Sequence, residues 1–94
     1  MIIAVVGVTG MVGEIILKLL AERNFPISEL IPVASRSSSG KEISFLEKKY
    51  QVVTIDQLLL RPVDLAFFSA GGSVSRDWAP KLAKRGCKVI DNSS

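Results

Sequence analysis

Continuous apolar runs punctuate the chain, and each predicts a buried strand. They are rich in β-branched or aromatic residues and lie at Ile2–Val6, Leu30–Ser35, Asp64–Ser69 and, at the start of a last strand, Val89–Ile90. Runs of this kind are typical of parallel strands that are covered on both faces of a sheet. Pro32 interrupts the second run, and we expect it near the strand's start or at an unpaired position.

Between these runs the apolar residues recur at helical spacing. A helix is predicted from Met11 onward and is closed by Asn24 and Pro26. Its apolar face comprises Met11, Val12, Ile15, Ile16, Leu19 and Leu20. A second helix is expected to be broken or restarted at Pro80 and to stop at Gly86. Its apolar face comprises Val74, Trp78, Leu82 and Ala83.

Two weaker patterns lie between the second and third apolar runs. Ile43–Phe45 and Tyr50–Val53 are predicted to form short strands paired across Leu46–Lys49. Asp56 is expected to cap a short helix that runs through Leu60. The alternation of strands and helices predicts the α/β class, with a Rossmann-like parallel sheet, flanking helices and right-handed crossovers.

Composition narrows the class of protein without naming a function. The chain has 94 residues, 48% of them hydrophobic and 22% charged, as in one small globular domain. Its net charge of +3 comes from scattered basic residues, so we expect no nucleic-acid partner. No apolar run reaches the ~18 residues of a membrane span, and no basic segment precedes the first run as in a signal peptide. The single cysteine fits a reducing, cytoplasmic location.

A glycine-rich turn, GVTGMVG at Gly7–Gly13, joins the first strand to the first helix. Glycine permits both a sharp turn and the close approach of a ligand to the backbone. The free N–H groups at the start of the helix suit a pyrophosphate, and Gly13 would let the helix pack closely on the strand. We therefore predict a dinucleotide site here, the alternative being three glycines that serve only the turn.

The segment after the second strand, ASRSSSGK at Ala34–Lys41, contains no carboxylate. Domains that prefer NAD usually place an acidic residue there for the ribose 2′-hydroxyl. Arg36, the serine hydroxyls and Lys41 would suit a 2′-phosphate instead. NADP is therefore expected over NAD, and an exposed polar loop without a ligand is the alternative.

The predicted strand Asp64–Ser69 ends in SAGGSVS at Ser69–Ser75. Ligands of open α/β sheets bind at the carboxyl ends of the strands, and small residues there would let a cofactor lie against the backbone. Gly71 and Gly72 favour that interpretation. Ser73 or Ser75 is a candidate cap of the following helix, and for these serines capping alone stays an open alternative.

Six segments, taken in order, resemble the aspartate-β-semialdehyde dehydrogenase family. They are GVTGMVG, RNFP, ASRSSSGK, FSAGGSVS, APKLAKRG and VIDNSS. The resemblance covers the whole chain, is closest to the bacterial branch, and is most specific in SAGGS followed by VIDNSS. It implies an NADP-binding domain joined to a catalytic, dimerising domain. The implied reaction is the reductive dephosphorylation of aspartyl 4-phosphate to aspartate semialdehyde, in lysine, threonine and methionine biosynthesis.

The resemblance also implies roles by motif position. The glycine turn would contact the cofactor's phosphates, and Arg36, Ser37 and Ser38 would contact the 2′-phosphate. The SAGG segment would run beside the cofactor. Asn92 would lie near the point where the nicotinamide meets the active site. The expected cofactor-binding residues are Gly7, Thr9, Gly10, Met11, Val12, Gly13, Arg36, Ser37, Ser38, Ser69, Ala70, Gly71, Gly72 and Asn92. Val8, Met11 and Ser39 stand where the family often has alanine, and these departures leave the backbone donors in place.

The catalytic groups of this chemistry have no counterpart in the chain. The reaction needs a thiolate nucleophile and a group that moves protons, yet there is no histidine and only Cys87. Cys87 is expected at the entry to the last strand, away from the ligand edge. Nearby Lys84, Arg85 and Lys88 would lower its thiol pKa, but that position favours a structural role. No catalytic residue and no metal site are therefore assigned.

In the family, the catalytic residues follow the segment that matches VIDNSS. We therefore expect residues 1–94 to be the incomplete amino-terminal part of the NADP-binding domain, inactive alone, from an enzyme that is a homodimer at full length. Three alternatives stay open: an enzyme like N-acetyl-γ-glutamyl-phosphate reductase, a non-catalytic NADP-binding module, and a fold that self-associates through an exposed sheet edge without binding a ligand.

Overall fold

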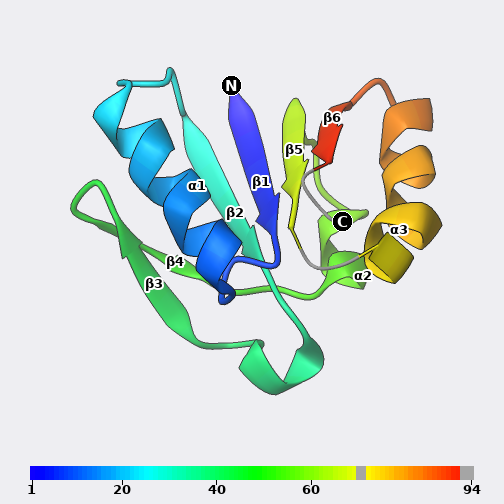
Figure 1. Cartoon of the computed structure of the whole chain (residues 1–94), viewed down its shortest axis with the longest axis horizontal. Helices are drawn as coiled ribbons and strands as arrows, with labels where there is room; N and C mark the ends of the chain where they lie inside the picture. The colour runs from blue at the N-terminus through cyan, green and yellow to red at the C-terminus, as the bar shows by residue number, and fades with distance from the viewer. Residues whose placement is uncertain (70–71, 92–94) are drawn as a thin grey trace.

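A four-stranded parallel sheet forms the centre of the molecule, in the order β2–β1–β5–β6 (Figure 1). The computed structural model describes the backbone of residues 1–69 and 72–91 and, within these, the side chains of all but residues 72 and 73. The strands are β1 (Ile2–Val6), β2 (Glu29–Val33), β5 (Leu65–Phe68) and β6 (Lys88–Asp91). All three pairings are parallel, which confirms the predicted Rossmann-like class.

Alternate residues of the sheet pack against different layers. Ile3 and Val5 of β1 belong to the core shared with helix α1 (Met11–Glu22). Ala4 and Val6 belong to the opposite core, which includes residues of α2 (Ile55–Leu58) and α3 (Gly72–Lys84). The continuous apolar run of β1 is thus explained by helices on both faces of the sheet (Figure 1).

A β-hairpin widens the layer that contains α1. Strands β3 (Glu42–Phe45) and β4 (Lys48–Gln51) pair antiparallel, and Phe45 joins the α1 core. The predicted hairpin is confirmed, but its turn is shorter than expected. Only Leu46 and Glu47 connect the strands, and both have positive φ angles of 50° and 67°. This is the backbone geometry of a tight two-residue turn.

The buried face of α1 is narrower than predicted. Gly13, Ile16 and Leu20 are buried, at the three- and four-residue spacing of one helix face. Met11, Val12, Ile15 and Leu19 lie to one side of that face and are exposed, with Met11 79% accessible. The predicted apolar face of the helix is therefore wider than the face that the fold buries. The predicted end of the helix is confirmed, because α1 stops at Glu22 and Asn24 has a positive φ of 49°.

The short helix α2 is capped by a residue that the sequence analysis missed. Thr54, not Asp56, is the N-cap, and the helix ends at Leu58 rather than Leu60. The Gln57 backbone N–H donates to the Thr54 hydroxyl at 3.5 Å, and the Thr54 N–H donates to the Gln57 side chain at 2.9 Å. This reciprocal pair is a capping box, whose T-x-x-Q pattern was available in the sequence.

Helix α3 continues through Pro80, so the predicted break there was wrong. Pro80 removes the donor for the carbonyl of Arg76, and both residues are exposed, where solvent can reach that carbonyl. The predicted stop at Gly86 is confirmed. Gly86 has a φ of 86°, and the N–H of Cys87 returns to the carbonyl of Leu82 at 3.2 Å.

Candidate nucleotide-binding site

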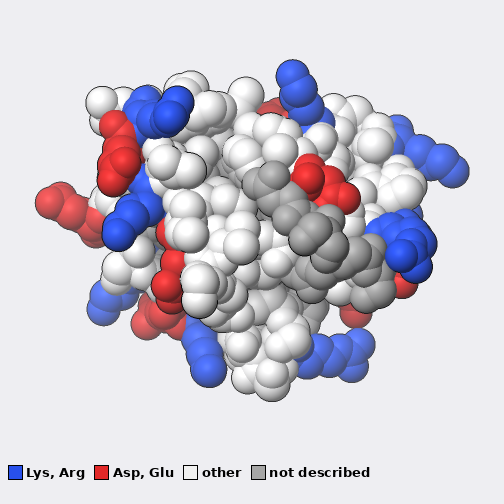
Figure 2. All heavy atoms as spheres, in the orientation of Figure 1, with Lys and Arg blue, Asp and Glu red and all other residues white. Residues whose placement is uncertain are grey.

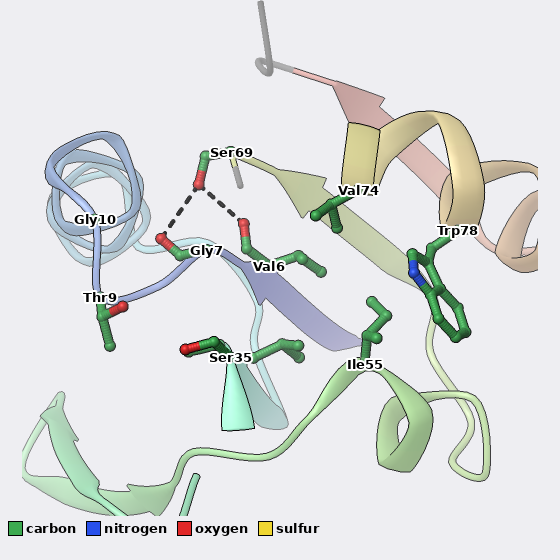
Figure 3. Close-up of a pocket in the computed structure, with 11 residues that line it drawn as sticks. Val6, Gly7, Thr9, Gly10, Ser35, Ile55, Ser69, Val74 and Trp78 are labelled. Carbon is green, nitrogen blue, oxygen red and sulfur yellow. Dashed lines mark hydrogen bonds between the residues drawn. The ribbon is translucent and has the colours of Figure 1, made fainter. Parts of the chain in front are cut away.

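A cavity of about 400 Å³ opens at the carboxyl ends of β1, β2 and β5 (Figure 3). From β1 the chain crosses by α1 to β2, whereas from β5 it crosses by α3 to β6 on the other side. The cavity therefore lies at the switch point where open α/β sheets bind their ligands. Its lining residues are Val6, Gly7, Thr9, Gly10, Val33, Ala34, Ser35, Ile55, Ser69, Val74 and Trp78.

The glycine turn between β1 and α1 is fixed by backbone hydrogen bonds. Gly7 has a φ of 89°, and its N–H donates to the carbonyl of Val33 at 2.8 Å. Gly10 is the N-cap of α1 and brings no side chain to bond the N–H groups of the first turn. These N–H groups lie at the amino-terminal end of α1, where the helix dipole favours an anion.

Gly13 is required by the close approach of α1 to this turn. A Cβ atom on Gly13 would lie 2.3 Å from the carbonyl oxygen of Gly7 and 2.8 Å from the Cα of Val8. Both are backbone atoms, which cannot move aside as a flexible side chain can. Close packing at Gly13 was predicted against the strand, whereas the structure shows it against the turn that follows β1.

Ser69 ties the end of β5 to the end of β1. Its hydroxyl donates to the carbonyl of Val6 at 2.9 Å, with the carbonyl of Gly7 at 3.5 Å (Figure 3). The side chain was predicted to contact the cofactor, and it does line the cavity. Its hydrogen bonds show an additional role, which is to hold two adjacent strand ends in register.

The predicted site residues do not all line the cavity. Gly7, Thr9, Gly10 and Ser69 line the cavity, whereas Met11 and Val12 form the first turn of α1 with exposed side chains. Gly72 begins α3, and only its backbone is described. The predictions for Ala70, Gly71 and Asn92 lie outside the described residues.

The residues predicted for the 2′-phosphate lie beside the cavity. Arg36–Ser38 form a short 3-10 helix directly after Ser35, a lining residue, and Ser35 and Ser37 share a hydrogen bond of 2.9 Å between their hydroxyls. The Arg36 guanidinium lies 3.4 Å from the carboxylate of Asp56. The sequence segment lacks a carboxylate, but the fold brings one to it from 20 positions further along the chain.

Sequence reasoning missed the apolar wall of the cavity. Ile55 of α2 and Val74 and Trp78 of α3 line the cavity on the side of these two helices (Figure 3). The ammonium of Lys81 lies 4.4 Å from the centre of the Trp78 ring. Helical spacing places Val74 and Trp78 on one face, but only the position of α3 against the sheet shows that this face borders a cavity.

The cap predicted for Ser75 was wrong. Ser75 lies inside α3 and is buried, and its hydroxyl donates to the Asp91 carboxylate at 2.5 Å. This bond links the start of α3 to the carboxyl end of β6. The side chain of Ser73, the other candidate cap, lies outside the described part of the molecule.

Cys87 lies at the amino end of β6, as predicted, and borders a separate cavity of about 240 Å³ with Asp64 and Arg85. Burial raises the pKa of the Cys87 thiol; Arg85 lowers it by a smaller amount, and Asp64 adds to the rise. The predicted lowering of this pKa was therefore wrong, because loss of hydration outweighs the attraction of nearby cations. A protonated, buried thiol is a poor nucleophile.

Three further observations concern possible metal ligands, membrane-spanning helices and the distribution of surface charge. Among residues 1–69 and 72–91, no three side chains of His, Cys, Asp or Glu gather as metal ligands would. In the same residues no helix has the length and apolar character needed to cross a membrane. On the face seen in Figure 2, Lys and Arg side chains are distributed around the outline rather than gathered in one stripe.

The parallel sheet, the glycine turn and the cavity at the switch point define a Rossmann-type nucleotide-binding domain. The family model described as "Semialdehyde dehydrogenase, NAD binding domain" matches residues 2–94, and the chain belongs to this family. The resemblance inferred from the six sequence segments is thereby confirmed.

Similar proteins are named aspartate-semialdehyde dehydrogenase. The chain is 52% identical over 93 residues to aspartate-semialdehyde dehydrogenase of Aquifex aeolicus, a match that covers 98% of this chain and 27% of that protein. It is 49% identical over 92 residues to the Legionella pneumophila enzyme, with 98% and 26% covered. A crystal structure of aspartate semialdehyde dehydrogenase II from Vibrio cholerae, complexed with ASA, matches with a TM-score of 0.93 and 44% identity, covering 99% of this chain and 30% of that one. The chain thus spans little more than a quarter of these relatives.

Proposed function

We propose that this chain is the NADP-binding part of an aspartate-semialdehyde dehydrogenase. The observation that carries the proposal is the cavity at the β1–β5 switch point, bordered by the glycine turn in a chain of this family. The complete enzyme would reduce aspartyl 4-phosphate to aspartate semialdehyde with release of phosphate. It would be a cytoplasmic homodimer that serves lysine, threonine and methionine biosynthesis.

The residues of the site fit a dinucleotide. Gly10, the N-cap of α1 and a lining residue, brings no side chain that would block a pyrophosphate, and the N–H groups of the first turn would hold its charge. The apolar wall with Ile55 and Trp78 suits a flat base, since aromatic and aliphatic side chains exclude water from its faces. When bound, the nicotinamide supplies the hydride, and these residues bind and orient the cofactor.

A second group of residues supports NADP in particular. Arg36 is 86% accessible and directly follows the lining residue Ser35, so its guanidinium can reach an anion at the cavity mouth. A 2′-phosphate would also meet the hydroxyls of Ser37 and Ser38. The family name specifies NAD binding in general, and the preference for NADP belongs to this proposal.

The relatives reported above do not favour an enzyme like N-acetyl-γ-glutamyl-phosphate reductase, because they share the aspartate-semialdehyde dehydrogenase name. We assign no nucleophile or proton-transfer group within these 94 residues. The chain alone is therefore expected to bind cofactor without turnover, and its substrate contacts would belong to the remaining three quarters of an enzyme of the relatives' length.

Calorimetric titration of the chain with NADP⁺ and NAD⁺ tests the proposal. We expect saturable binding that prefers NADP⁺. Arg36→Glu should weaken NADP⁺ binding by about 10- to 100-fold, the value of one or two lost charge-assisted hydrogen bonds, and should change NAD⁺ binding much less. Lys18→Glu, an equal charge change on the exposed side of α1, is the control. Equal losses for both cofactors would contradict the assignment of Arg36, and no binding by the folded chain would contradict the proposed function.

A further inference from the structure

The ion pair between Arg36 and Asp56 lies beside the cavity. Each partner directly follows a lining residue, Ser35 in the first case and Ile55 in the second (Figure 3). The two charged side chains therefore mark the edge of the cavity where the segment after β2 meets the start of α2. Any ribose substituent that reaches Arg36 also comes near a carboxylate.

We propose that Asp56 is a second residue that determines coenzyme selectivity and that it opposes Arg36. This inference rests on the proposed function, because it concerns the same nucleotide site. Arg36 attracts the 2′-phosphate of NADP, whereas Asp56 repels that phosphate and accepts a hydrogen bond from the 2′-hydroxyl of NAD. Because Asp56 opposes Arg36, the preference for NADP over NAD is smaller than the ASRSSSGK segment would give without Asp56.

The geometry allows Arg36 to exchange partners. The pair is 3.4 Å apart and both side chains are open to water, at 86% and 55% accessible. Surface pairs of this kind are weak because solvent screens both charges. A phosphate with a charge of about −1.5 to −2 and several acceptor oxygens is a stronger partner for a guanidinium. Asp56 would remain close to the bound phosphate, and its repulsion would reduce the affinity that Arg36 contributes.

A purely local role for Asp56 is the competing explanation. Asp56 lies in the first turn of α2, where a negative charge interacts favourably with the helix dipole. However, α2 has only four residues, and the capping box of Thr54 and Gln57 already provides acceptors for the N–H groups of both these residues. A structural role would change the stability of the chain and leave the ratio of the two cofactor affinities unchanged, so the two explanations can be separated.

The experiment compares wild type with Asp56→Asn by calorimetry against NADP⁺ and NAD⁺. Adenosine 2′,5′-bisphosphate and 5′-AMP, which differ only in the 2′-phosphate, repeat the comparison without the nicotinamide half. Trp78, the only tryptophan of the chain and a lining residue, gives a second reading by fluorescence. Glu22→Gln, which removes an equal charge from the last residue of α1, is the matched control. Urea unfolding of each variant shows that it is folded.

Asp56→Asn should raise the ratio of NAD⁺ to NADP⁺ dissociation constants about tenfold, through less repulsion of the phosphate and a weaker bond to the 2′-hydroxyl. Glu22→Gln should leave the ratio within about twofold, because solvent screens distant charges. If folded Asp56→Asn keeps the wild-type ratio, or if both variants shift it equally, this inference is overturned and the proposed function stands. If folded wild type binds none of the four nucleotides, both are overturned.

Discussion

Alanine at Gly13 is expected to destabilise the chain, although the same change stabilises most exposed helix interiors. The added Cβ would lie 2.3 Å from the Gly7 carbonyl oxygen and 2.8 and 3.0 Å from the Cα and carbonyl carbon of Val8. Ordinary contact begins near 3.4 Å. To relieve the overlap, α1 and the turn must separate by about 1 Å, which disturbs close packing that interiors do not readily adjust.

The expected loss follows from two opposing terms. Overpacking a close contact costs about 1–3 kcal/mol, and rigid backbone neighbours place Gly13 at the upper end of that range. Replacing a helical glycine by alanine stabilises the folded state by about 0.5–1 kcal/mol, because the chain with alanine loses less conformational entropy when it folds. The net loss is about 2 kcal/mol. For a small domain this lowers the urea midpoint by about 1–2 M.

Urea unfolding followed by Trp78 fluorescence measures this loss, and Gly10→Ala is the matched control. A Cβ on Gly10 would lie 3.4 Å from the Gly7 oxygen, which is ordinary contact, and its φ of −83° suits alanine. Its cost should stay below about 1 kcal/mol, since alanine is only a poorer N-cap. A midpoint for Gly13→Ala at or above that of wild type would refute the reasoning.

Two further predictions concern the capping box and the buried thiol. Thr54→Ala should lower the free energy of unfolding by about 1 kcal/mol because α2 loses its cap, while Thr54→Ser should retain most of it; equal urea midpoints for the two variants would contradict this. Because burial raises the pKa of Cys87, the folded state holds the thiol proton at a pH where the unfolded chain has released it. The contribution of the neutral Cys87 thiol to the free energy of unfolding is fully present below the ordinary thiol pKa of about 8.5. It is lost as the pH rises above that value, because only the unfolded chain then releases the proton. Urea midpoints from about pH 7 to 10 should therefore fall more steeply for wild type than for Cys87→Ala, and parallel curves would show that Cys87 has no such effect.

The sequence by itself determined the strands, the main helices and the glycine turn. Continuous apolar runs such as Ile2–Val6 specify strands covered on both faces, because every residue of such a run must be buried. The positive φ of Gly86 and the close approach at Gly13 are local demands that glycine meets with the least strain, so they are visible as glycines in the sequence. The six sequence segments, taken in their order along the chain, were enough to indicate the family.

The tertiary structure alone decided which side chains share the site. Asp56 meets Arg36, and Trp78 joins the cavity wall, only because the β2–β1–β5–β6 order brings α2 and α3 to the ends of β1 and β2. Sequence patterns record the spacing of neighbours along one element, whereas these contacts join elements that are distant along the chain. The pKa of Cys87 has the same origin, since burial depends on what packs around the thiol and outweighs the cations that adjoin it in sequence.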